Sequence, residues 1–68
     1  SNDERLKQIT DQMSGVDEKT KQAWSKKART VMEKYNQLRA QAFGQKDYEA
    51  TLKRLDQQEQ KELAGIRV

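Results

Sequence analysis

Apolar and polar residues alternate along this chain with the period of an α-helix. Between residues 24 and 42 the apolar side chains recur at spacings of 4, 3, 4, 3 and 4, and at about 100° per residue they fall within about 80° of one another. The members of this apolar stripe are Trp24, Ala28, Val31, Tyr35, Leu38 and Ala42. A sustained heptad-type spacing predicts that another helix covers this face.

Three glycines divide the chain into three predicted helices. Gly15, Gly44 and Gly65 each follow an apolar-periodic stretch, where a helix C-cap favours glycine. Proline is absent, and good helix formers such as Ala, Leu, Gln, Glu, Lys and Arg dominate between the glycines. The predicted helices are 2–13, 16–43 and 46–64, within a single module that spans residues 1–68.

The break at Gly15 leaves two interpretations open. In the first, Ser14 caps the second helix, with Asp17 three residues later as in a capping box. In the second, residues 1–43 form one helix whose stripe runs through Gly15 with a stutter; that longer stripe contains Leu6, Ile9, Met13, Val16, Thr20 and Trp24. We predict an all-α fold, either an antiparallel hairpin or a three-helix bundle, with turns near Gly15 and Gly44. We favour three helices.

The third predicted helix carries a matching stripe that one acid interrupts. Its apolar members are Tyr48, Leu52, Leu55, Leu63 and Ile66, and Glu59 occupies a stripe position. We assign the seam between helices, or between this chain and a partner or second copy, to Trp24, Val31, Tyr35, Leu38, Leu52 and Leu55. Met32, about 80° from the stripe, widens the apolar face towards a second neighbour, which favours a bundle over a two-stranded coiled coil. A partner protein would engage the stripe or the groove beside Met32.

Apolar residues are few for a domain of this length. They make up 32% of the 68 residues, against 37% charged residues, and the mean hydropathy is −1.27. The core is therefore thin, and we expect self-association or support from a protein partner. Apolar runs are too short for a transmembrane helix or a signal peptide, so we expect a soluble chain and leave its compartment, cytoplasmic or periplasmic, open. The start at Ser1 without methionine suggests a piece of a longer protein or a mature exported one.

The residues needed for common catalytic sites are missing. The chain contains no histidine and no cysteine, which removes the usual general base near neutral pH, the thiol nucleophile and the commonest zinc ligands. The adjacent acids Asp3-Glu4 and Asp17-Glu18 point in different directions on a helix and do not form a carboxylate pair. We therefore expect no enzymatic activity, no catalytic residue, no cofactor, no metal site and no small-molecule substrate.

A net charge of +3 suggests an alternative partner. The excess lies in the second predicted helix, where the candidate anion-binding residues are Lys19, Lys26, Lys27, Arg29 and Lys34. Such a stripe can bind nucleic acid or an anionic surface. Glu33 interrupts it, however, and no aromatic residue is interleaved to stack on bases. We favour a protein–protein interaction module (an adaptor, chaperone-like or assembly domain), and keep a small basic nucleic-acid-binding or anionic-surface-binding protein as the alternative.

Residues 38–56, LRAQAFGQKDYEATLKRLD, resemble a known family over under a third of the chain. They are similar to the helix-turn-helix segments of lipase-specific periplasmic chaperones, which also place a short apolar-glycine turn between two amphipathic helices. The resemblance implies a helical turn around Gly44, and no residue role is transferred from it.

Overall fold

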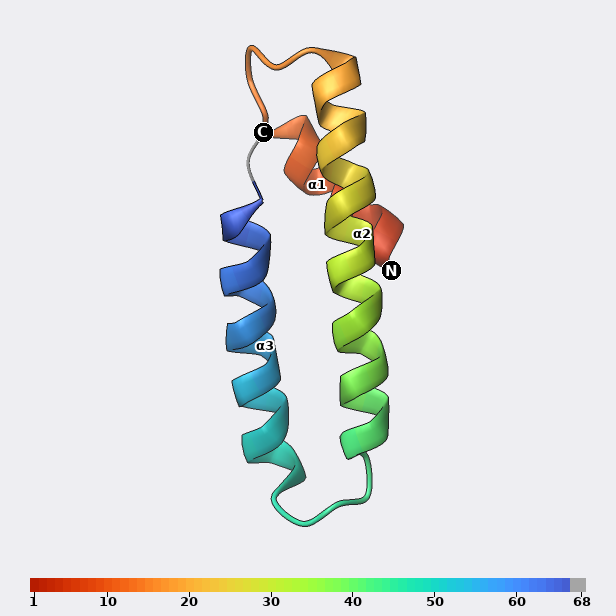
Figure 1. Ribbon diagram of the computed structural model, residues 1–68, viewed down its shortest axis with the longest axis vertical. Helices are drawn as coiled ribbons and strands as arrows, with labels where there is room; N and C mark the ends of the chain where they lie inside the picture. Colours follow the sequence, from red (N-terminus) through yellow and green to blue (C-terminus); the bar gives the residue numbers. More distant parts are fainter. Residues whose placement is uncertain (67–68) are drawn as a thin grey trace.

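The described part of the chain folds into three α-helices. The computed structural model describes residues 1–66, in which α1 (Asn2–Asp11), α2 (Glu18–Ala42) and α3 (Tyr48–Gly65) follow one another without an intervening strand (Figure 1). The prediction of an all-α fold with turns near Gly15 and Gly44 is confirmed, and it takes the form of a small three-helix bundle. The single chain does not adopt the alternative of one continuous helix over residues 1–43, because residues 12–17 are not helical.

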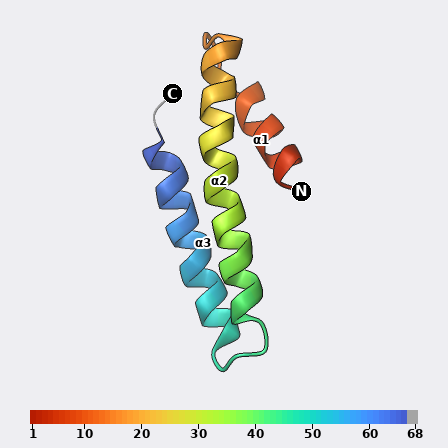
Figure 2. The same cartoon turned by 45° about the vertical axis from the view of Figure 1, so that its right-hand side comes forward.

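The helices form an antiparallel hairpin with a short third helix against one end. α2 and α3 lie side by side and are joined by the turn around Gly44, while α1 packs on the N-terminal part of α2 (Figures 1 and 2). The molecule measures 45 × 18 × 15 Å, so it is elongated. At 1.5 Å per residue the ten residues of α1 cover roughly 15 Å, against roughly 38 Å for α2. The hairpin therefore extends well beyond α1.

The ends of the helices around the first turn differ from the predicted ones by about two residues. Asp17, rather than Ser14, is the N-cap of α2, and its carboxylate accepts a hydrogen bond from the backbone N–H of Thr20 at 2.7 Å. This bond holds the pKa of Asp17 below its ordinary value, because it stabilises the ionised carboxylate at the helix N-terminus. Gly15 has a φ of 77°, a left-handed conformation that glycine adopts without a steric penalty. The chain thus needs residues 12–17 to reverse direction.

The core lies where all three helices meet. Leu6, Trp24, Ala28 and Met32 are buried together, and the partly buried residues packed against them are Ile9, Met13, Leu63 and Ile66. Met32 is completely inaccessible to solvent. Because α1 packs on the side of α2 that carries Met32, the buried face is rotated from the predicted stripe towards that residue. The predicted widening of the apolar face towards Met32 therefore corresponds to the packing of α1, the second helix that contacts α2.

Candidate interaction surface and the polar contacts that shape it

Most of the residues assigned to the seam pack inside this chain. Trp24, Tyr35 and Leu55 are buried. Val31 and Leu52 are half-buried, and Leu38 is 36% exposed. The stripe is thus divided into a part that α1 and α3 cover and a part at the margin of the hairpin. Leu38 lies at that margin because the buried face has rotated away from it.

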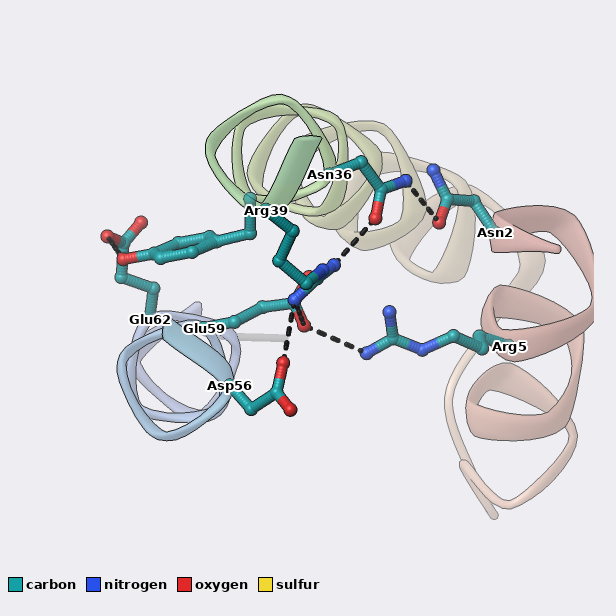
Figure 3. Close-up of polar contacts among 8 residues, drawn as sticks. Asn2, Arg5, Asn36, Arg39, Asp56, Glu59 and Glu62 are labelled. Carbon is teal, nitrogen blue, oxygen red and sulfur yellow. Dashed lines mark hydrogen bonds and ion pairs between the residues drawn. The ribbon is translucent and has the colours of Figure 1, made fainter. Parts of the chain in front are cut away.

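A buried carboxylate joins the three helices. Glu59 of α3 is 3% exposed, and its Oε1 accepts hydrogen bonds from Arg39 of α2 at 3.2 Å and from Arg5 of α1 at 3.4 Å (Figure 3). The other oxygen of Glu59 accepts a bond from Arg39 at 3.4 Å. Figure 3 shows the carboxylate between two guanidinium groups that come from different helices. The acid that interrupts the third predicted stripe is therefore paired from two sides.

Arg39 extends this network to the surface. Its guanidinium also donates to Asp56 at 2.9 Å and to the side-chain oxygen of Asn36 at 2.6 Å, and Asn36 donates to Asn2 at 3.2 Å (Figure 3). Burial lowers the pKa of Arg39, but the hydrogen bonds and negative charges of Glu59 and Asp56 outweigh it and raise the pKa overall. Two arginines face two carboxylates, so the network is balanced in charge. It fixes the position of α1 against the hairpin.

The sequence shows that Glu59 interrupts the apolar stripe of the third predicted helix, but it does not identify the partners of this acid. The signal that was available was an acid at an apolar stripe position, since a buried carboxylate requires a cationic partner. Arg39 is four residues after the stripe member Tyr35, so it lies beside the apolar face of α2. Arg5 is 54 positions away in sequence, and only the docking of α1 brings it to Glu59.

A second polar cluster lies on α2 and α3 around Glu62. Its carboxylate accepts hydrogen bonds from the Tyr35 hydroxyl at 2.5 Å and from the Lys34 ammonium at 2.8 Å. The bonds from Lys34 and Tyr35 lower the pKa of Glu62, and the same carboxylate raises the pKa values of Lys34 and Tyr35. The ammonium also lies 4.9 Å from the centre of the Tyr35 ring. This cluster clamps the two hairpin helices together.

We expect this cluster to make the stability of the chain depend on pH. Since the pKa of Glu62 is lowered on folding, its contribution is complete above its ordinary pKa of about 4.5 and is lost as the pH falls through the folded-state value. The raised pKa values of Lys34 and Tyr35 act in the opposite direction, and their contribution is lost as the pH rises above about 10. Urea unfolding midpoints measured from about pH 7 down to about pH 3 check the acid limb. Glu62→Gln should show a smaller decrease, and an identical decrease would exclude a role for the cluster.

The basic residues of α2 do not form one free surface. Arg29 pairs with Asp3 of α1 at 2.5 Å, and Lys34 pairs with Glu62 of α3 at 2.8 Å. Lys19, Lys26 and Lys27 are exposed and form no ion pair within residues 1–66. The structure thus divides the five predicted anion-binding residues, because two of them point towards neighbouring helices. Three lysines near the N-terminal end of α2 remain accessible to an anionic partner.

The far end of the hairpin presents large apolar side chains to solvent. Phe43 is 76% exposed, and its ring packs edge-on against Tyr48, with the ring centroids 5.6 Å apart. Leu38 lies five residues earlier on α2 and about 140° round the helix from Phe43, while Lys46 in the turn and Arg54 on α3 are exposed. We call Phe43, Lys46 and Tyr48, which lie within six residues of one another around the turn, the hairpin-end surface. α1 does not reach it, since the first residues of α1 contact α2 at Asn36.

Other features of the described residues are of the ordinary kind. A groove of about 290 Å³ lies between α1 and α2 and is lined mostly by polar side chains, among them Thr10, Lys21 and Ser25. Within residues 1–66, acidic residues do not gather in a group that could hold a metal ion. Among the described residues, no helix is both long enough and apolar enough to cross a bilayer.

Comparison of the chain with protein-family models, with curated proteins and with solved structures found no match. The similarity of residues 38–56 to segments of lipase-specific chaperones is therefore a resemblance of a short helical turn.

Proposed function

We propose that this chain is a non-catalytic protein–protein interaction module that binds a partner protein through the hairpin-end surface. The observation that carries the proposal is the 76% exposure of Phe43 on a hairpin whose other aromatic residues are buried or half-buried. Aromatic side chains held in place on a rigid element are typical anchors of protein interfaces. The contact with Tyr48 holds the Phe43 ring at the turn.

The chemistry of this end suits a partner with an apolar pocket and acidic residues around it. Burial of a Phe side chain contributes about 1.5 to 3 kcal/mol, so Phe43 could anchor an interface. Lys46 is exposed in the same turn and makes no ion pair within the described residues, and an acidic group on the partner would pair with it. Two aromatic side chains, Phe43 and Tyr48, are too few for a stable symmetric contact between two such ends, because specific interfaces bury about 1,600 Å². The partner must therefore supply the pocket.

A protein partner accounts for this surface better than nucleic acid does. The accessible lysines at positions 19, 26 and 27 lie towards the opposite end of α2, roughly 24 to 36 Å from Phe43 along the helix axis. An anionic strand would therefore meet the basic residues and the exposed aromatic ring at two separate places.

The proposal is tested with one exposed side chain. A protein captured on the chain is identified, purified and titrated against wild type, Phe43→Ser and the control Gln37→Ser, which changes an exposed residue of α2. We expect Phe43→Ser to raise the Kd at least about 30-fold, the effect of losing about 2 kcal/mol of anchor energy, and Gln37→Ser to leave it unchanged. Both variants should melt like wild type, because neither position is buried. Equal Kd values for all three proteins would overturn the proposal.

A further inference from the structure

α1 depends on the rest of the chain for its helical structure. It contains ten residues, and isolated helices shorter than about 12 residues are marginal in water. Leu6 is its one buried residue, and Ile9 is only partly buried. Its ion pairs, Asp3 with Arg29 and Arg5 with Glu59, involve its first turns. Among the three helices, α1 is thus the element that can leave its place at the lowest free-energy cost.

The segment that joins α1 to α2 can itself become helical. Residues 12–17 read Gln-Met-Ser-Gly-Val-Asp and contain no proline. The strongest barrier to a continuous helix is Gly15, which has a φ of 77° in the turn. A Cβ atom placed on Gly15 would meet nothing within 4 Å, so backbone conformation rather than packing makes glycine favourable there.

We call residues 12–17 the hinge. If the hinge became helical, the core residues of α1 and α2 would lie on one side of a single long helix. At about 100° per residue, Leu6 and Trp24 are separated by five full turns and share one direction, and Met13 lies within about 20° of it. The turn at Gly44 behaves differently. A continuous helix there would place Leu55 about 140° from Ala42, and the two apolar faces would point away from each other. The sequence is thus compatible with opening at Gly15 and not at Gly44.

α1 runs antiparallel to α2. Two copies of the chain that exchanged α1 would therefore form a closed dimer. Asn2 contacts Asn36, and Asp3 contacts Arg29. If the same contacts formed between two copies, two long helices would run antiparallel, with the two hinges close to the symmetry axis. Such an isologous arrangement closes on itself as a dimer.

We propose that two copies of this chain exchange α1. Residues 12–17 straighten, Leu6 of one copy enters the Ala28 and Met32 cluster of the other, and Arg5 pairs with Glu59 of the partner subunit. The binding site is the groove of α2 and α3 that α1 fills in the monomer, and its ligand is the α1 helix of a second copy. The hairpin-end surface takes no part, so this proposal and the proposed function can fail independently.

Substitution of the two left-handed glycines tests the exchange. Gly15→Ala and its matched control Gly44→Ala introduce the same strain, since Gly44 has a φ of 80° and is equally open. A helical hinge would relieve the strain in Gly15→Ala but not the strain in Gly44→Ala. We expect Gly15→Ala to lower the dimer dissociation constant at least about 100-fold in sedimentation equilibrium, because both hinges of the dimer lose strain and gain a better helix former. Gly44→Ala should leave it unchanged.

A second variant and a cross-link distinguish exchange of α1 from association of strained or partly unfolded chains. Ser14→Ala keeps Gly15 and cannot strain the turn, and it should lower the dissociation constant about fivefold. The chain has no cysteine, so Asn2→Cys and Asn36→Cys can be introduced separately, each with Ser14→Ala, mixed and treated with a short bis-maleimide. Exchange predicts a cross-link between the two different chains. A folded Ser14→Ala protein that stays monomeric at millimolar concentration, or a dimer without this cross-link, would overturn the proposal.

Discussion

Glu59→Ala is expected to lower the free energy of unfolding by about 3 kcal/mol, near the low end of the cost of breaking a buried ionic network. The carboxylate of Glu59 is almost inaccessible and is shared by Arg5 and Arg39. Without this carboxylate, Arg39 retains its ion pair with Asp56, but its largely buried guanidinium loses the partner on its other side. Arg5 loses its ion pair with α3. The low end of the range applies because Arg5 can turn towards water, its side chain being 42% exposed.

Thermal unfolding followed by circular dichroism measures this effect. For a domain of this size, 3 kcal/mol corresponds to a decrease in Tm of roughly 12 to 24 °C. Glu33→Ala is the matched control, because Glu33 is an exposed acid of α2 that forms no ion pair within residues 1–66, and its Tm should remain close to that of wild type. Glu59→Gln, which keeps the size and polarity of the side chain, should lie between the two. If Glu59→Ala melted together with Glu33→Ala, the network would not hold the helices.

Removal of the Trp24 side chain should destabilise the fold by about 3 to 5 kcal/mol, the usual cost of truncating a large buried aromatic residue. Trp24 is 5% exposed and belongs to the cluster formed with Leu6, Ala28 and Met32. Since a domain of 68 residues has a total stability of roughly 3 to 10 kcal/mol, Trp24→Ala should lose much of its cooperative unfolding transition.

The matched control for Trp24→Ala is Phe43→Ala, which also removes an aromatic ring. Because Phe43 is 76% exposed, its removal should change the free energy of unfolding by about 0.5 kcal/mol or less. Urea unfolding followed by circular dichroism compares the two variants without relying on tryptophan fluorescence. Similar losses of stability for both variants would contradict a core in which Trp24 is buried with Leu6, Ala28 and Met32.

The amino-acid sequence by itself determined the three helices and the positions of their turns. Helix formation depends on hydrogen bonds between residues four apart and on local propensity, and glycine at positions 15 and 44 supplies the left-handed conformation that each turn requires. The helix boundaries near Gly15 were wrong by about two residues. Ser14 and Asp17 are both good capping residues, and the space needed for the reversal of α1 decided between them.

The tertiary structure decided which side of α2 is buried, what Glu59 binds and where the chain remains uncovered. Each of these depends on the docking of α1, which turns Met32 inward, leaves Leu38 at the margin and brings Arg5 to Glu59 across 54 positions of sequence. Spacing along one helix gives the direction of a side chain relative to its own axis only. Which direction faces a neighbour is fixed by contacts between segments far apart in the chain, and periodicity contains no information about them.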